Sequence, residues 1–521
     1  MTTPVMQKLP YGVGQWGRGW FIIAVIAALI TGFGLFAYSR QLIEGLAATG
    51  LGDIGTAGGS AWGLYIAFDV YFVGVSFAGI TIAALIRLMN LERLKPVARM
   101  AEGLTIVSLV LAALMVIIDL GQPGRGIINL LRYARPQSPF FGTFTLVISA
   151  YLFASLVFLY LEGRRDAALC AQKPGKLQGF FRLWAAGYGD TREERERHNR
   201  TAWWLALFIL PLLVTAHSTL GMIFGIQPGR PGWYSALQAP SFVVLAGVSG
   251  VGLLIVIVAI LRKALRLEDK LDIQVFRWLG NFLWILTAVY LYFIIVDFLT
   301  ANYSGGSREA TIYGALTNGP YAWLFWLTVS MFILSFILMF GQFARRRYSI
   351  TLVTIAGVLA NFAAIGKRDV IVIPSQTHGT MLPYEAGTYT PTWVELTIIL
   401  GLFALGALLY IVFTKVFPVM EVHDGKNETV APAEETGKLQ NNGTARKRMF
   451  VVTLLSGIAL AVAGFLLAAP IGPTADPMYS DPRIPFAPLI FVIGIIVTIL
   501  SPVVYELFPD KRGEKREAVK A

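Results

Sequence analysis

The stretch MIFGIQPGRPGWYSALQAPSFVVLAGVSG, residues 222–250, joins two long apolar runs through a short turn rich in glycine and proline. The runs cover residues 202–225 and 239–261, and a helix rises about 1.5 Å per residue. Each run is therefore long enough to cross about 30 Å of hydrocarbon as a helix. Glycine and proline at this density fix the backbone of the turn. The stretch predicts two spanning helices joined by a structured turn at one membrane surface.

The rest of the chain repeats this pattern. It has 521 residues, of which 56% are hydrophobic and 14% are charged, and its mean hydropathy is +0.64. This composition is typical of a polytopic membrane protein and excludes an ordinary soluble domain. We expect an all-α fold with about 12 transmembrane helices, at residues 20–39, 62–86, 102–120, 139–161, 202–225, 239–261, 276–300, 321–342, 349–366, 392–416, 450–470 and 486–508.

The 43 Lys and Arg residues are distributed unevenly between the two sides of these helices. The termini and the connections on their side carry 32 of them, whereas the connections on the other side carry nine. Cytoplasmic connections of membrane proteins are enriched in Lys and Arg. We therefore expect both termini in the cytoplasm. The formal net charge of +12 then reflects orientation in a lipid bilayer and does not indicate a nucleic-acid partner.

Two of the cytoplasmic connections are long. Residues 162–201 contain an amphipathic stretch, LQGFFRLWAAGYG, followed by a charged run that is typical of a solvated helix start. Residues 417–449 are polar and rich in Glu, Lys, Asn and Gly, as flexible linkers are. We expect a ten-helix membrane core at 1–420, a cytoplasmic linker at 421–448 and an appended two-helix segment at 449–521.

The sequence holds few ligands for a metal cofactor. Cys170 is the single cysteine, which excludes an iron–sulfur cluster, a thiolate-bound zinc or a covalently attached haem held by this chain alone. His217 is the one histidine inside a predicted span, and a bis-histidine haem needs two. We expect no metal site, haem or iron–sulfur cluster in the chain, so such a group belongs to a partner.

Several ionisable residues fall inside the predicted spans, where a charge is costly and each one is a functional hypothesis. They are Asp69, Glu102, Asp119, His217, Asp297 and Glu395. The topology places four of them in the outer third of their helices, where we expect them to share one pocket: Asp119, His217, Asp297 and Glu395.

Each of these residues has two interpretations. An imidazole exchanges protons near neutral pH, so His217 is a candidate proton acceptor beside a redox-active oxygen. Its alternative role is a hydrogen bond to a carbonyl in a helix interface. Asp69, Asp297 and Glu102 are candidates for a proton path, or else they form hydrogen bonds with neighbouring Ser or Tyr side chains.

Two spans end outward in the same turn sequence, QPGR, at residues 122–125 and 227–230. Arg125 and Arg230 are either anchors where the chain leaves the membrane or ligands of a site at the outer surface. Trp233 follows the second turn, where an interfacial aromatic belt is expected in any case. The repetition at equivalent helix ends favours a common role in shaping the outer surface.

Four motifs, taken together and in order, resemble one known family. They are WGLYIAFDVYFVGVSFAGI (62–80), IDLGQPGRGIINLLRYARPQSPFFGTF (118–144), IFGIQPGRPGWYSALQAPSFVVLAGVSG (223–250) and YTPTWVELTIILGLFALGALLYIVFTKVFPV (389–419). They resemble the NrfD/PsrC-like family, the membrane subunits of respiratory molybdenum-enzyme and multihaem complexes. The likeness runs from residue 18 to 420. Within this family the chain looks most like the larger, ten-helix branch. That branch includes the membrane subunits of alternative complex III, of the Hmc and Qrc complexes and of the DsrP-type sulfur complexes.

The resemblance implies two four-helix bundles in a prokaryotic cytoplasmic membrane, with menaquinone or ubiquinone bound near the outer surface. It implies electron exchange with a ferredoxin-like iron–sulfur subunit on the outer face, in complexes that also contain molybdenum-enzyme-like or multihaem cytochrome c subunits. By motif, the quinone-binding residues are Asp119, Arg125, His217, Arg230, Trp233 and Glu395. His217 and Asp119 are then the catalytic pair, and proton translocation through Asp69, Asp297 and Glu102 is an associated hypothesis.

Two other functions are open at this point. Twelve helices with both termini inside is also the plan of a secondary transporter, although here the long connection follows the fourth predicted span and not the sixth. The chain is alternatively a structural anchor without a quinone site. Copurification with an iron–sulfur protein and a quinone titration distinguish these functions.

Overall fold

The computed structural model describes residues 9–51, 60–138, 150–304, 306–378, 387–422, 443–468 and 484–508. Over these residues the regular secondary structure is helical, without a strand, which confirms the all-α prediction. The long helices are α1 (Arg18–Glu44), α2 (Leu64–Leu88), α3 (Lys95–Asp119), α6 (Leu152–Ala171), α8 (Arg192–Gly225), α9 (Gln238–Ala264), α10 (Ile273–Leu299), α12 (Ala322–Arg345), α13 (Ile350–Val372), α15 (Trp393–Val416), α16 (Gly443–Leu467) and α17 (Ala487–Leu507).

Short helices connect the long ones. They are α4 (Pro123–Tyr133), α7 (Gln178–Ala185), α11 (Ser307–Thr317) and α14 (Pro374–Thr377), with 3-10 turns at Pro10–Gly12, Gly45–Ala48 and Glu92–Leu94 and a π-helical turn at Thr300–Ser304. In the described part of the chain, 11 helices are long and apolar enough to cross a membrane, which confirms a multi-pass membrane protein. The predicted span at 139–161 begins in residues 139–149, which lie outside the described residues, and its later part belongs to α6.

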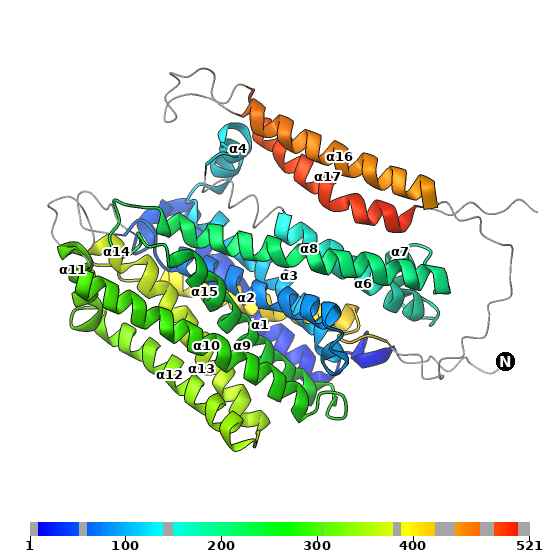
Figure 1. Ribbon diagram of the computed structural model, residues 1–521, viewed down its shortest axis with the longest axis horizontal. Coiled ribbons are helices and arrows are strands. Elements are labelled where there is room, and N and C mark those ends of the chain that lie inside the picture. Colours follow the sequence, from blue (N-terminus) through cyan, green and yellow to red (C-terminus); the bar gives the residue numbers. More distant parts are fainter. Residues whose placement is uncertain are drawn as a thin grey trace, which may run out of the picture.

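Two rings of four helices form the body of the protein (Figure 1). In the first bundle α2 packs on α3, α3 on α6, α6 on α8 and α8 on α2. In the second bundle α9, α10, α12 and α13 pack in the same cyclic way, and α9 also packs against α2 and α8. The two four-helix bundles are therefore present and share a continuous interface.

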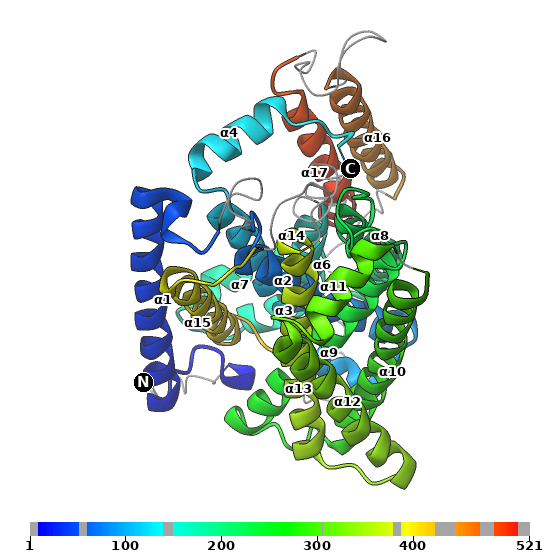
Figure 2. The ribbon, with the colours of Figure 1, turned by 90° about the vertical axis from the view of Figure 1, so that its left-hand side faces the viewer.

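Two helix pairs lie outside these bundles (Figure 2). The α1/α15 pair packs against α2 and α3, with Gly34 and Gly401 in contact between the two helices. The α16/α17 pair lies above α8 and α6 in Figure 1 and contacts α4, α6 and α8 through α17. The predicted linker is residues 421–448, of which 423–442 lie outside the described residues.

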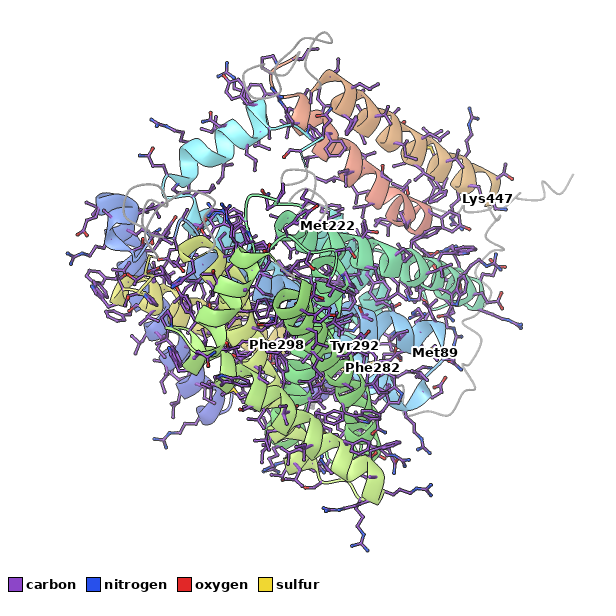
Figure 3. All side chains as sticks on the ribbon, turned by 60° about the vertical axis from the view of Figure 1, so that its left-hand side comes forward. Met89, Met222, Phe282, Tyr292, Phe298 and Lys447 are labelled. Carbon is purple, nitrogen blue, oxygen red and sulfur yellow. The ribbon has the colours of Figure 1, made fainter. Side chains whose placement is uncertain are left out.

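We call the end of the bundles at which α3, α8, α10 and α13 finish the outer end, following the orientation that the Lys and Arg distribution predicts. Helices α11 and α14 lie at this end, on the left in Figure 1, and α7 lies at the opposite, inner end. Apolar side chains such as Met222, Tyr292 and Phe298 project from the bundle surface (Figure 3). Exposed apolar surface of this extent fits a lipid environment.

Two helices begin or end beyond their predicted limits for identifiable reasons. Helix α8 starts ten residues before the predicted span because Thr191 and Glu194 form a capping box, in which the Thr191 hydroxyl accepts a 3.2 Å hydrogen bond from the Glu194 N–H. Helix α13 runs to Val372, whereas the prediction ended at 366. The apolar residues 370–373 continue its buried face, so Lys367, Arg368 and Asp369 lie in a helix and not in an outer loop.

Candidate functional site

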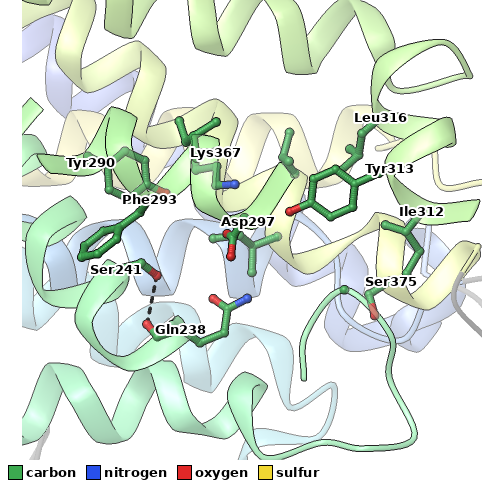
Figure 4. Close-up of a pocket in the computed structure, with 14 residues that line it drawn as sticks. Gln238, Ser241, Tyr290, Phe293, Asp297, Ile312, Tyr313, Leu316, Lys367 and Ser375 are labelled. Atoms are coloured by element: carbon green, nitrogen blue, oxygen red, sulfur yellow. Dashed lines mark hydrogen bonds between the residues drawn. The ribbon is translucent and has the colours of Figure 1, made fainter. Parts of the chain in front are cut away.

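A pocket opens at the outer end of the second bundle, among α9, α10, α11 and α13 (Figure 4). The space within it, together with the solvent-open part in front of it, is about 510 Å³. The apolar part of its lining is Phe293, Ile294, Ile312, Leu316, Val370 and Ile371, and the rest is Gly232, Gln238, Ser241, Tyr290, Asp297, Tyr313, Lys367 and Ser375. We call it the outer pocket.

An acid and a base face each other in the outer pocket. Asp297 near the end of α10 interacts electrostatically with Lys367 of α13 and with Tyr313 of α11. Figure 4 shows the Lys367 amine and the Tyr313 hydroxyl directed toward Asp297. An ammonium and a phenol donate hydrogen bonds, whereas a carboxylate accepts a proton. This arrangement suits a planar apolar molecule that carries oxygen atoms and exchanges protons.

The turn at residues 227–233 forms one lip of the pocket. Two hydrogen bonds hold it against α13 and α14: the Trp233 indole N–H donates to the Ile371 carbonyl at 2.7 Å, and the Ser375 hydroxyl donates to the Pro231 carbonyl at 2.6 Å. Gly232 has a φ of +82°, and a Cβ there would lie 2.9 Å from Ile312 Cδ1. Only glycine allows both this backbone conformation and the close approach of α11.

An aromatic cluster supports the same lip from behind. The Trp233 ring stacks on Trp62 with 5.7 Å between centroids and packs edge-on against Phe224 at 5.1 Å. The Gln376 side chain accepts a 3.0 Å hydrogen bond from the Trp62 N–H and donates a 2.8 Å bond to the Trp62 carbonyl. Trp233 is 5% exposed. It is therefore a packing and hydrogen-bonding residue of the lip, and not only an interfacial anchor.

His217 lies deeper, inside the first bundle where α8 faces α2, and is not among the residues that line the outer pocket. Its Nδ1 lies 2.9 Å from the Leu213 carbonyl oxygen and its Nε2 lies 3.0 Å from the Val73 carbonyl oxygen. A neutral imidazole has one N–H and makes only one of these bonds, whereas the cation makes both. This geometry fits the alternative prediction of a hydrogen bond to a carbonyl, and a second bond forms only when the ring carries a second proton.

Arg368 is the other charged group in this central region. Its guanidinium lies 4.4 Å from the centroid of the Phe242 ring, it is 2% exposed, and its Nη1 has no hydrogen-bond partner among the described residues. It interacts electrostatically with both His217 and Tyr290. Tyr290 also lines the outer pocket. The charge of Arg368 therefore acts both on a residue of the pocket and on His217.

Asp119 and Glu395 lie together on the other side of the molecule, near the outer ends of α3 and α15. Asp119 interacts electrostatically with Glu395 and with Asp69 of α2. One oxygen each of Asp69 and Asp119 is buried without a hydrogen-bond partner among the described residues. The four residues expected in one pocket therefore lie in three places: Asp297 in the outer pocket, His217 in the centre, and Asp119 with Glu395.

Glu395 caps the start of α15. Its Oε2 accepts hydrogen bonds from the N–H groups of Gly50 at 2.7 Å and Thr392 at 2.9 Å, and its Oε1 accepts one from the Tyr389 hydroxyl at 2.6 Å. Burial, together with the Glu395 carboxylate, raises the pKa of Tyr389, so this hydroxyl stays a donor. With three donors satisfied, the geometry of Glu395 is that of a structural cap.

The remaining predicted site residues lie near the two ends. Arg125 is exposed on α4, and Arg230 is partly exposed above the Trp233 ring, 6.0 Å from its centroid. The first QPGR sequence opens α4, whereas the second forms a tight turn, so the two copies differ in structure. Glu102 is buried near the inner end of α3, where Arg99 donates to it at 3.1 Å.

The prediction did not include Lys367, Arg368 and Tyr313. The first two were assigned to a loop because the predicted span stopped before them. The signal that identifies them is the apolar run 370–373, which follows the charges and shows that the helix continues. Tyr313 has no such signal, because only the packing of α11 against the bundle directs it into the outer pocket.

Comparison with known proteins decides the family. A family model described as polysulphide reductase, NrfD, matches residues 52–379. The chain belongs to the polysulphide reductase NrfD family. The match covers more than half of the chain and includes every residue that lines the outer pocket, whereas α15, α16 and α17 follow it. The resemblance that the four motifs indicated is thereby confirmed.

Three relatives in this family resemble the chain along most of its length. A putative membrane subunit of a dimethyl sulfoxide reductase from Halobacterium salinarum is 28% identical over 78% of this chain and 92% of its own. A selenate reductase subunit from Mesobacillus selenatarsenatis is 26% identical over 76% and 95%. An Hdr-like menaquinol oxidoreductase integral membrane subunit of Archaeoglobus fulgidus is 26% identical over 77% and 94%.

Proposed function

We propose that this chain is the quinone-reactive membrane subunit of a redox complex and that the outer pocket binds the quinone ring. Family membership and relatives that are subunits of reductases or oxidoreductases support a role within a redox complex. The name of the Archaeoglobus fulgidus relative supports a quinol, menaquinol, as the substrate class. The observation that carries the proposal is the outer pocket itself, with apolar walls and the facing Asp297 and Lys367.

Oxidation of a quinol releases two electrons and two protons. In the outer pocket Lys367 and Tyr313 donate hydrogen bonds to the ring oxygens, and Asp297 accepts the two protons in turn, releasing the first to water at the outer end before it takes the second. The apolar walls take the ring and exclude water from it. Reduction of a quinone uses the same groups in the opposite direction. Menaquinone and ubiquinone share this chemistry.

The electrons pass to or from a partner subunit. Among the described residues no group of three or more His, Cys, Asp and Glu side chains is arranged to hold a metal ion. The proposed partner is an iron–sulfur subunit seated on the outer face, beside the lip with Arg230 and near α4 with Arg125. Positive charges at this rim favour an acidic partner surface. Molybdenum-enzyme-like or multihaem cytochrome c subunits complete the proposed complex in a prokaryotic cytoplasmic membrane.

A row of polar groups extends from the centre toward the inner end and forms the proposed proton path. The Ser76 hydroxyl donates at 2.6 Å to the same Val73 carbonyl that His217 contacts, and the Thr105 hydroxyl donates at 3.0 Å to the Ser76 carbonyl. Glu102 lies one turn before Thr105 on α3. His217 in this role passes protons between the outer half and Glu102, while Asp69 and Asp119 form a second polar group on α2 and α3.

The variants Asp297→Asn and Lys367→Met test the quinone site. Each is expected to lower quinol oxidation by the purified complex by about 10²–10⁴-fold, because a positioned proton acceptor or hydrogen-bond donor is lost. Glu309→Gln on α11 is the matched control, because Glu309 does not line the outer pocket. Wild-type turnover in both pocket variants, with the complex assembled, would show that the quinone reacts elsewhere.

The variants His217→Gln and Asp119→Asn test the proposed proton path separately from the outer pocket. Both should retain quinone binding, measured by titration of the purified complex, and lose quinone-linked electron transfer. A chain that purifies without an iron–sulfur partner and binds no quinone would instead support a transporter, and a chain with the partner but without quinone binding would support a structural anchor.

A further inference from the structure

A second cavity lies at the inner end of the first bundle, far from the outer pocket. Its volume is about 410 Å³, and α2, α3, α6, α8 and the segment after α15 surround it. We call it the inner cavity. Its polar lining is Arg87, Asn90, Lys95, Glu102, Glu162, Arg165, Asp166, His198, Asn199 and Glu421.

Two buried groups that line the inner cavity have unused hydrogen-bonding capacity. Glu162 is 9% exposed; Arg87 pairs with its Oε2, while its Oε1 has no partner among the described residues. His198 is 6% exposed, and its Nδ1 also lacks a partner in the described part of the chain. Buried polar atoms normally bond to protein or to ordered water. Both residues line one space that is large enough for water.

The chemistry of the lining favours protons over other ligands. The cavity is lined by both carboxylates and cations, so the lining does not form a site of one charge for a phosphate or a metal ion. Arg99 already contacts Glu102 at 3.1 Å and Asp166 at 3.0 Å, and the Val422 N–H donates to the second Asp166 oxygen at 3.0 Å. Glu162 and His198, each with an unpartnered buried atom among the described residues, are the candidates to hold an exchangeable proton.

Helix α17 of the appended pair reaches this site with a carboxylate. The Glu506 side chain is fully buried and accepts a 2.6 Å hydrogen bond from the Thr201 hydroxyl of α8. It also lies 3.5 Å from Arg164 Nη1 of α6 and 3.6 Å from Arg197 Nε of α8. His198 lies between Arg197 and Thr201 on the same helix, and Glu506 interacts with it electrostatically.

Charges from every neighbouring element act on His198. They are Arg87 of α2, Glu162 and Arg164 of α6, and Glu506 of α17, with Arg197 adjacent on α8 and Tyr188 packing edge-on at 6.0 Å between ring centroids. Without Glu506, the cation of Arg164, which is 3% exposed, would lack its carboxylate partner. The Glu506 carboxylate of the appended α16/α17 pair thus neutralises the Arg164 cation near His198 of the core.

We propose that the inner cavity is a hydrated proton-exchange site in which Glu162 and His198 hold the exchangeable proton, and that the appended helix α17 completes the site with Glu506. That this proton takes part in quinone chemistry rests on the proposed function. The existence of the proton-exchange site does not depend on the proposed function. The pair lies outside the segment that the family model matches, so the completed site is a feature that α17 adds to the family core.

The test is infrared spectroscopy of the full-length chain in liposomes while the pH is changed, without quinone. The wild-type chain should show a titrating carboxyl band and a titrating imidazole band. Glu162→Gln should remove one carboxyl contribution and His198→Gln one imidazole contribution from these bands, and Glu506→Gln should change the pH at which both contributions titrate. The matched control is Glu196→Gln, on the same helix, whose side chain is 65% exposed in a pair with Arg192; it should lose only the signal of one exposed carboxyl and leave the signals of Glu162 and His198 unchanged.

Spectra of His198→Gln and Glu506→Gln that superimpose on the wild-type spectrum would overturn the proposal. These two variants decide the matter even if Glu162→Gln does not fold, because His198→Gln leaves the Arg87–Glu162 pair intact. Quinol oxidation by the assembled complex is measured separately. Its absence in the wild type would refute the proposed function, while the infrared result alone would decide the inner cavity.

Discussion

Glu395 provides the sharpest test, because sequence and structure assign it different roles. The motif PTWVE predicts a quinone ligand, whereas the structure shows a carboxylate saturated by the Gly50 N–H at 2.7 Å, the Thr392 N–H at 2.9 Å and the Tyr389 hydroxyl at 2.6 Å. A cap and a ligand respond differently to substitution. The variant Glu395→Gln removes the charge with little change in shape, and Glu395→Ala removes every acceptor.

The hydrogen bonds set the magnitudes. In Glu395→Gln the amide oxygen still accepts hydrogen bonds from the two N–H groups, but these bonds are no longer charge-assisted. The bond from the Tyr389 hydroxyl is lost, and the total cost is about 2–3 kcal/mol of stability. In Glu395→Ala three buried donors lose their acceptor, and the cost rises to about 5 kcal/mol. The control is Glu44→Gln, which removes a pair with Arg40 whose side chains are 52% and 42% exposed. Exposed pairs of this kind contribute less than about 1 kcal/mol.

Unfolding by SDS in mixed micelles measures these differences, and quinol oxidation is followed on the same samples. A cap predicts that both Glu395 variants unfold at lower SDS fractions than Glu44→Gln, with turnover retained in the folded Glu395→Gln protein. The cap interpretation would be refuted if Glu395→Gln unfolded like the wild type and yet lost quinol oxidation. Glu395 would then be a quinone ligand, as its motif predicts.

Three further predictions concern the lip and its surroundings. Trp233→Phe keeps the aromatic ring but loses the bond to the Ile371 carbonyl, for about 1 kcal/mol, and Trp233→Ala, which also loses the ring contacts, should cost about 3–5 kcal/mol in the same SDS unfolding assay. Gly232→Ala should raise the KM for quinol and destabilise the protein by about 1–2 kcal/mol, and adding Ile312→Val should recover only the steric part; an unchanged KM would show that the lip does not shape the pocket. Burial lowers the pKa of His378 below 6.5, so the unfolded chain binds this proton more readily. The contribution of neutral His378 to the free energy of unfolding should therefore be fully present above about pH 6.5 and should decrease as the pH falls below this value. His378→Gln should reduce that decrease, and identical pH profiles for the two proteins would contradict the assignment.

The sequence by itself determines the membrane fold and the family. The apolar runs predict the spanning helices because a bilayer of fixed thickness demands a minimum helix length, and the four motifs identify the family that the comparison confirms. The ionisable residues in the spans, among them Asp297 and His217, also follow from the sequence, since a charge at such a position is too costly to be incidental.

Only the tertiary structure decides which of these residues meet. The sequence places Asp297, His217 and Glu395 in the outer third of their helices, yet they lie in a pocket, at the contact of α8 with α2 and in a helix cap respectively. Sequence periodicity gives the depth of a residue in the membrane but not the rotation of its helix against its neighbours. That rotation brings Lys367 to Asp297 and Glu506 to His198, because packing between helices far apart in the chain fixes it.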